Sequence, residues 1–140
     1  MCLDKLLDIP SELPSVGYKV FRKKWGKYRP VFSTTDENAP SQGFSIGKEY
    51  VAVEREVFVD SENMDPYLSG FHTFVKLMHA QMYIKSIKNF YVNNDWFWNL
   101  TIAKVKISDV TYYGEQFIGG NNKRVPCIVS RKMQILEEIV

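Results

Sequence analysis

The stretch GFHTFVKLMHAQMYI, Gly70–Ile84, decides the fold of this chain. Its first part, Gly70–Phe74, combines aromatic residues with His and Thr and carries no charge, which is typical of a short buried strand. From Val75 onward, apolar residues recur at the 3.6-residue spacing of an amphipathic helix. We therefore expect a helix over about residues 75–90, with Thr73 as its N-cap.

Strand signals precede this helix. Gly17–Arg22 (GYKVFR) alternates between two faces, and Lys23–Gly26 reads as a turn whose glycine can adopt a positive φ. Lys27–Phe32 returns as a second strand, in which Pro30 cannot donate to a ladder. This second strand therefore belongs at a sheet edge or at a bulge. Lys48–Val59 is the longest strand-like stretch.

Strand signals also follow the helix. Thr101–Ile107 alternates cleanly, Ser108–Asp109 is expected to begin a turn, and Val110–Ile118 reads as a weaker strand pair. Gly119–Asn122 (GGNN) is a strong turn signal, and Val125–Ile139 supplies the closing strands, with Glu137 and Glu138 expected to be solvated.

The expected architecture is α+β, with a curled, mainly antiparallel sheet packed on one principal helix at about 75–90. At 140 residues the chain is long enough for one core. Residues 1–16 form a short N-terminal arm, and residues 17–140 form the single domain. Leu3, Leu6 and Leu7 would share one side of a helical turn in the arm, which is either a mobile tail or a docking segment.

Composition excludes several classes of protein. The formal charge is only +2, which disfavours nucleic acid as a partner without excluding a local binding cluster. Cys2 and Cys127 form no disulfide framework, which indicates a reducing, cytoplasmic setting. No apolar run approaches the roughly 18 residues of a membrane span. Aromatic residues make up 14% of the chain, which suggests a ring-rich core or an exposed aromatic surface.

A basic aromatic hairpin, residues 18–29, is the first candidate site. Its cations and rings alternate along the sequence, and they are Tyr18, Lys19, Phe21, Arg22, Lys23, Lys24, Trp25, Lys27, Tyr28 and Arg29. Cations attract phosphate, and exposed rings stack on bases. The alternative is a solvated hairpin whose rings belong to the core.

Two further constellations are weaker. GFHTF places His72 and Thr73 beside each other, with His79 further on, although a histidine between aromatics is more often structural. Asn93–Asn99 carries Trp96 and Trp98, which suit either a planar ligand or a loop that covers the core. Two histidines and two scattered cysteines give no zinc spacing, and no nucleophile, phosphate-loop or metalloprotease motif is present. We therefore expect no catalytic residues, no metal and no cofactor.

The order GYKVFR, GFHTF with Ala80 in the helix, VKI and VSRKMQIL resembles a family of small uncharacterised domains from phage and bacterial genomes, sometimes encoded beside pentapeptide repeats. The resemblance covers most of residues 17–139 and implies no activity. GFHTFVKLMHAQMY is also faintly similar to the middle motif of ADP-ribosyltransferase folds. That resemblance would match Arg22, Thr73 and Glu115 to the NAD-site residues of that family, but Thr73 stands where a Ser or Tyr is expected.

The expected function is that of a non-enzymatic binding protein, a phage accessory or anti-defence factor that sequesters a nucleotide-type small molecule or a host immune component in the host cytoplasm. Eight residues are the expected ligand contacts: Tyr18, Arg22, Lys24, Trp25, His72, Thr73, Trp96 and Trp98. The alternatives are an ADP-ribosyltransferase-like enzyme that uses NAD and a homo-oligomerising structural module.

Overall fold

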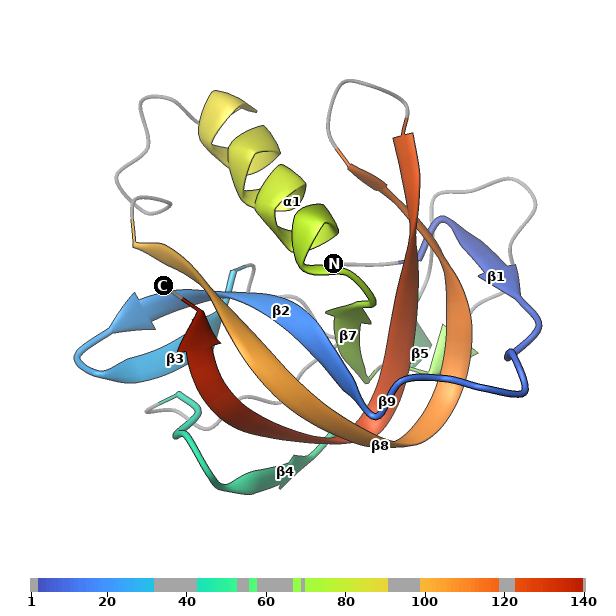
Figure 1. The fold of residues 1–140 in the computed structure, drawn as a ribbon, viewed down its shortest axis with the longest axis horizontal. Coiled ribbons are helices and arrows are strands. Elements are labelled where there is room, and N and C mark those ends of the chain that lie inside the picture. Colours follow the sequence, from blue (N-terminus) through green and yellow to red (C-terminus); the bar gives the residue numbers. More distant parts are fainter. Residues whose placement is uncertain are drawn as a thin grey trace.

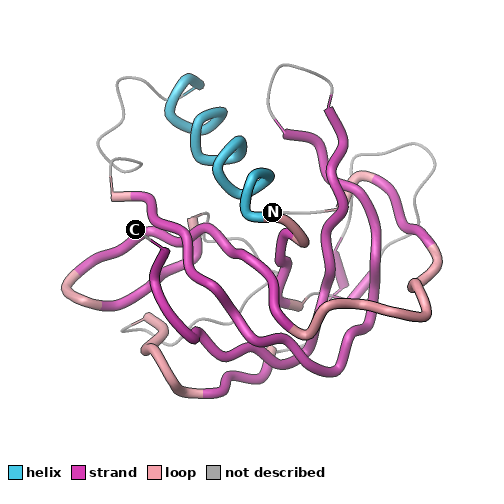
Figure 2. Tube along the Cα trace, in the orientation of Figure 1, coloured by secondary structure: helices cyan, strands magenta, loops and turns pink. Residues whose placement is uncertain are grey.

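The computed structural model describes residues 3–31, 43–52, 56–57, 67–68, 70–90, 99–118 and 123–139. Within these ranges the chain is mostly antiparallel sheet with one helix, which confirms the expected combination but gives the sheet the larger share (Figure 2). The elements are β1 (Lys5–Leu7), β2 (Val16–Lys24), β3 (Lys27–Pro30), β4 (Glu49–Val51), β5 (Glu56–Val57), β6 (Tyr67–Leu68), β7 (Phe71–Phe74), α1 (Leu77–Phe90), β8 (Leu100–Ile118) and β9 (Lys123–Ile139).

Four strands pair in a closed circuit. β2 pairs with β8, β8 with β9, β9 with β7, and β7 with β2, and all four pairings are antiparallel. β1 extends the sheet from β8, β4 extends it from β9, and β3 pairs with β2. The long hairpin of β8 and β9 curves beneath α1 (Figure 1). This curvature allows one hairpin to pair with several shorter strands.

β8 is one continuous strand of 19 residues, so the turn expected at Ser108–Asp109 and the expected strand pair over Val110–Ile118 are wrong. Asp109 adopts a φ of 59°, and the register with β9 shifts between Val110 and Tyr112. An extra residue of this kind bends a strand without ending it. The stretch Lys48–Val59 was expected to be the longest strand, but its described parts are the short strands β4 and β5.

α1 lies within the range expected from the sequence, but Thr73 is not its N-cap. Thr73 belongs to β7, is fully buried and pairs with Ile128 of β9. The first-turn amides of His79 and Ala80 donate instead to the carbonyl oxygen of Lys76. Thr73 therefore pairs within the sheet and does not serve as the N-cap that its residue type predicted. No helix in the described ranges is long and apolar enough to cross a lipid bilayer.

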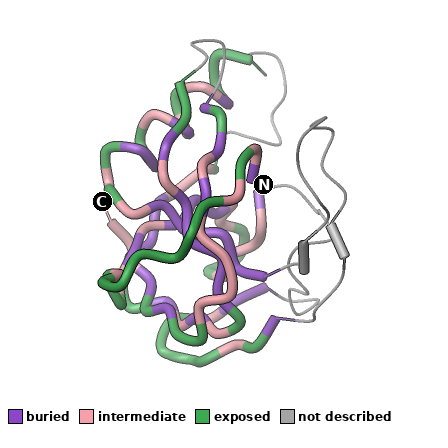
Figure 3. The backbone as a smooth tube through the Cα atoms, turned by 90° about the vertical axis from the view of Figure 1, so that its right-hand side faces the viewer, coloured by how far each residue is buried: buried purple, intermediate pink, exposed green. Residues whose placement is uncertain are grey.

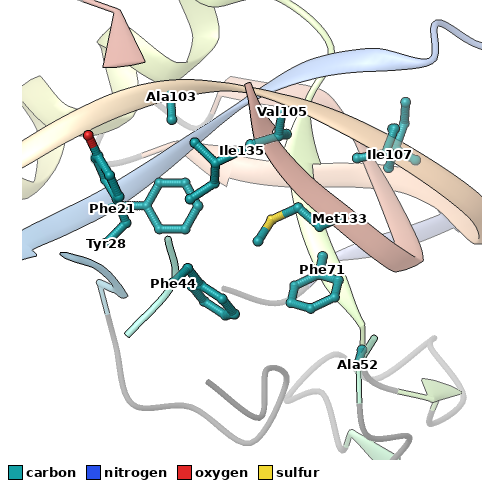
Figure 4. Packing of buried hydrophobic residues seen from close by; sticks show 11 residues of the cluster. Phe21, Tyr28, Phe44, Ala52, Phe71, Ala103, Val105, Ile107, Met133 and Ile135 are labelled. Atoms are coloured by element: carbon teal, nitrogen blue, oxygen red, sulfur yellow. The ribbon is translucent and has the colours of Figure 1, made fainter. Parts of the chain in front are cut away.

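Hydrophobic residues are buried on both faces of the sheet. On the face toward α1, Ala80, Tyr83 and Ile87 belong to the same core cluster as Val20 and Phe74. On the opposite face, four buried side chains point toward one another in Figure 4: Phe21, Phe44, Phe71 and Met133. β4 and α1 lie on opposite sides of the sheet in Figure 1. In Figure 3 the buried segments run through the crossing strands, while exposed segments lie at the periphery.

The N-terminal arm is extended where a helical turn was expected. β1 pairs with β8, and the preceding Leu3 is completely buried. A Cβ at Gly114 would overlap the carbonyl oxygen of Lys5, so glycine is what allows β1 to approach β8 this closely. The backbone amide of Phe117 donates to a carboxylate oxygen of Asp4. The arm therefore docks on the sheet.

Candidate binding surface

The turn of the basic aromatic hairpin has an unusual residue in it. Lys24 and Lys27 are the last paired residues of β2 and β3, so the loop consists of Trp25 and Gly26 alone. Their φ angles are 51° and 72°, as a type I′ turn requires. The expected positive φ at Gly26 is confirmed. Asn, Asp or Gly normally fills the first of these two positions, and a bulky residue with φ > 0 is an outlier.

The side chain of Trp25 is exposed to solvent. It is 84% exposed, which makes it the most exposed large hydrophobic residue in the described part of the chain. The Nζ atom of Lys24 lies 4.5 Å from the centre of the indole ring, at cation–π distance. Packing therefore does not explain why the turn carries tryptophan.

Four cations share one face of the hairpin, which we call the cation face. Arg22 pairs with Arg29, and Lys24 pairs with Lys27. Directly opposed residues lie on the same side of a sheet, and so do residues two apart along a strand. Burial and, to a smaller extent, the neighbouring Arg29 lower the pKa of Arg22. Like charges directly opposite each other destabilise a strand pair, and on this face Lys27 Nζ donates a hydrogen bond to Ser45 Oγ at 2.5 Å.

The other face of the hairpin is structural. Phe21 and Tyr28 are buried in the core, and a single carboxylate holds the hairpin to β9. Glu138 accepts hydrogen bonds from Lys23 Nζ (2.9 Å), Tyr28 Oη (3.0 Å) and Thr101 Oγ1 (2.7 Å). Glu138 was expected to be solvated, but the closing strand brings it beneath the hairpin. The core interpretation of the hairpin is therefore correct for Phe21 and Tyr28, and two of its cations, Lys19 and Lys23, make structural hydrogen bonds.

The Glu138 cluster predicts a pH-dependent stability. The hydrogen bond from Thr101, followed by that from Lys23, lowers the pKa of Glu138. A carboxyl whose folded-state pKa is lowered contributes stability above its unfolded pKa of about 4.3, and this stability is lost as the pH falls through the folded-state value. We expect Glu138→Gln to lower the free energy of unfolding by about 1 kcal/mol at pH 7. Urea denaturation at pH 7 and at pH 3 should show this difference shrinking in acid; a constant difference would contradict the assignment.

His72 and Thr73 lie inside the sheet. Both are fully buried in β7. The Nδ1 atom of His72 lies 3.1 Å from the carbonyl oxygen of Gly70, and the backbone oxygen of His72 accepts a hydrogen bond from Lys19 Nζ at 2.8 Å. The Oγ1 atom of Thr73 is buried and has no hydrogen-bond partner in the described ranges. A ligand on the outer part of the hairpin does not reach either residue.

The hairpin does bring Arg22, Lys24 and Trp25 together. Tyr18 lies further down the same face, half-buried against the helix-side core. Trp96 and Trp98 fall outside the described residues. Lys27 and Arg29 are the two residues of the cation face that the structure adds to the expected contacts. The position of Arg29 follows from the turn, since a loop at Trp25–Gly26 places residue 29 directly opposite residue 22.

The residues matched to the ADP-ribosyltransferase motif lie on three different strands, β2, β7 and β8. Arg22 pairs with Leu100 at the start of β8, Glu115 lies 15 residues further along that strand, and Thr73 is buried in β7. Cys127 is also buried, and desolvation raises the pKa of its thiol to about 12, so it stays protonated and unreactive at neutral pH.

Comparison with known proteins identifies no relative: the chain matches no family model, no curated protein and no solved structure.

Proposed function

We propose that this chain is a non-enzymatic binding protein that holds a phosphate-bearing, nucleotide-type partner on its basic aromatic hairpin. The observation that carries the proposal is Trp25. A non-glycine residue held at positive φ costs on the order of 1 to 3 kcal/mol, and an 84% exposed ring recovers almost none of it by packing. Strain of this kind is characteristic of functional positions.

The cation face supplies the second support. Four positive side chains on one face attract an anion, and the guanidinium group of an arginine can donate two parallel hydrogen bonds to a phosphate. An indole ring beside these cations adds a flat apolar surface for a base. Phosphate and base together describe a nucleotide-type partner better than they describe a simple anion or an apolar ligand.

The cellular role follows from the phage resemblance and remains part of the proposal. A protein that holds a nucleotide-type molecule on its surface withholds it from other receptors without chemical change. In a host cytoplasm, this would make the chain an accessory factor that sequesters a host signal or host component.

Charge reversal of the cation face tests the proposal. We expect Lys24→Glu/Arg29→Glu to weaken binding at least tenfold in calorimetric titrations against a panel of nucleotides and oligonucleotides, because two attractive charges become repulsive. Lys106→Glu is the matched control, since Lys106 is an exposed strand lysine paired with Val16 at the far end of β2. Circular dichroism checks that each variant folds. Equal affinity of the double variant and the control would exclude the hairpin as the binding surface.

A further inference from the structure

We infer that the partner of the hairpin is a single-stranded nucleic acid and not a free nucleotide, an inference that rests on the proposed function. The first argument is shape. β2 and β3 extend away from α1 and meet at the Trp25–Gly26 turn, where the side chain of Trp25 is 84% exposed (Figure 1). A projecting ridge touches a small molecule on one side only. It can, however, contact a strand at several successive points.

The spacing of the cations provides the second argument. The pairs Arg22–Arg29 and Lys24–Lys27 are two residues apart along each strand, a separation of about 6.8 Å in an antiparallel sheet. A stacked nucleic-acid strand carries one phosphate per about 3.4 Å, so the two pairs span about two phosphates. A polymer can therefore contact both pairs and the turn beyond them at the same time.

The exposed ring favours an unpaired strand. A base in a duplex has both faces covered by its neighbours, whereas a base in a single strand can stack on an aromatic side chain. Trp25 presents its ring at the tip of the hairpin, with the Lys24 ammonium beside it. An acidic protein segment would match the charge of this surface but would leave the ring without a planar partner.

The charge distribution orients the partner. Residues 22–29 carry five positive charges and no negative one, and one of the five, Lys23, is ion-paired with Glu138 on the other face of the hairpin. Removing the four charges of the cation face from the chain's +2 leaves −2 for all other residues, so the rest of the chain is net acidic. A polyanion is therefore attracted to the hairpin and repelled by the remaining protein. The low overall charge argued against nucleic acid as a partner, but it is the sum of a basic hairpin and a net acidic remainder.

Fluorescence anisotropy with labelled oligothymidylates of 3 and 15 nucleotides tests the inference. Unlabelled thymidine triphosphate, a 15-base-pair duplex and a glutamate decapeptide serve as competitors. We expect the 15-mer to bind at least tenfold more tightly than every competitor and than the 3-mer. With two to four phosphates contacted, log Kd should rise with log salt with a slope of about 1.4 to 2.8.

Ring variants complete the test. Trp25→Ala should weaken binding of the 15-mer about tenfold, within the range measured for loss of one base–aromatic stack. Phe117→Ala is the matched control, because Phe117 is a partly exposed ring with the Arg124 guanidinium 4.6 Å from its centre, on the far end of β8. It should leave binding unchanged.

The outcomes separate this inference from the proposed function. Equal binding of the triphosphate and the 15-mer would overturn the single-strand inference and leave a nucleotide-binding hairpin in place. Tighter binding of the duplex or the acidic peptide would also overturn it. If none of the probes bound, the proposed function would fail as well.

Discussion

Replacing Phe44 with alanine is expected to lower the free energy of unfolding by about 3 to 5 kcal/mol, the largest effect of any single substitution considered. The ring is completely buried. Its centre lies 6.1 Å from that of Phe21, 4.7 Å from that of Tyr50 and 5.9 Å from that of Phe71, all in edge-to-face geometry. Removal of the ring leaves a cavity at the centre of this cluster.

The position of Phe44 explains why so much depends on it. It lies outside the named strands, yet its backbone exchanges two hydrogen bonds with Tyr28 of β3. It therefore anchors the free edge of the hairpin to the core. Urea denaturation measures the loss, with Phe90→Ala as the control, because Phe90 is 80% exposed and should change stability by less than about 0.5 kcal/mol. Similar losses in the two variants would show that the described core is wrong.

Trp25→Asn is expected to improve stability and impair binding together. Asparagine tolerates positive φ and is preferred at the first position of a type I′ turn, so the free energy of unfolding should rise by about 1 kcal/mol. The same substitution removes the exposed ring, so affinity for the partner should fall about tenfold. If Trp25 serves binding at the expense of turn stability, Trp25→Asn should raise the free energy of unfolding and lower the affinity together.

Gly26→Ala serves as the control for the turn itself. Its φ of 72° disfavours any side chain, so alanine should lower stability by about 1 kcal/mol while the ring of Trp25 stays in place. Thermal unfolding and anisotropy on the same samples separate the two effects. If Trp25→Asn lost stability, or if it bound as tightly as the unmodified chain, strain at Trp25 would have no functional meaning.

Local sequence predicted the parts of the fold that depend on local interactions. Gly70–Phe74 and the apolar stripe after it indicated β7 and α1, because burial and helical spacing are legible within a few turns. The continuity of β8 was not predictable, since Ser108–Asp109 has the composition of a turn. Only pairing with β9 over nearly its whole length carries the strand through that point.

The candidate site also combines features that local sequence predicts with features that depend on long-range pairing. The turn and its cations could be identified from residues 18–29, but the sequence left open whether the rings of this stretch are exposed or buried. The separation of that stretch into a cation face and a core face required the register. Glu138 lies 110 residues from Tyr28 in sequence, and no local sequence pattern predicts the hydrogen bond between them. His72 and Thr73 were expected as ligand contacts even though their strand was predicted to be buried. Pairing with β2 and β9 covers the two edges of this strand, and the core clusters that contain Phe71 and Phe74 cover its two faces.

The most direct test of the binding surface is a nuclear magnetic resonance titration with a 15-nucleotide oligothymidylate. It follows the backbone amide signals and the indole N–H signals. The account predicts that the Trp25 indole signal and the amides of residues 22–29 shift most, while those of β1 and of Phe117 at the far end of β8 stay in place. Shifts centred anywhere else, with the hairpin signals unmoved, would contradict it.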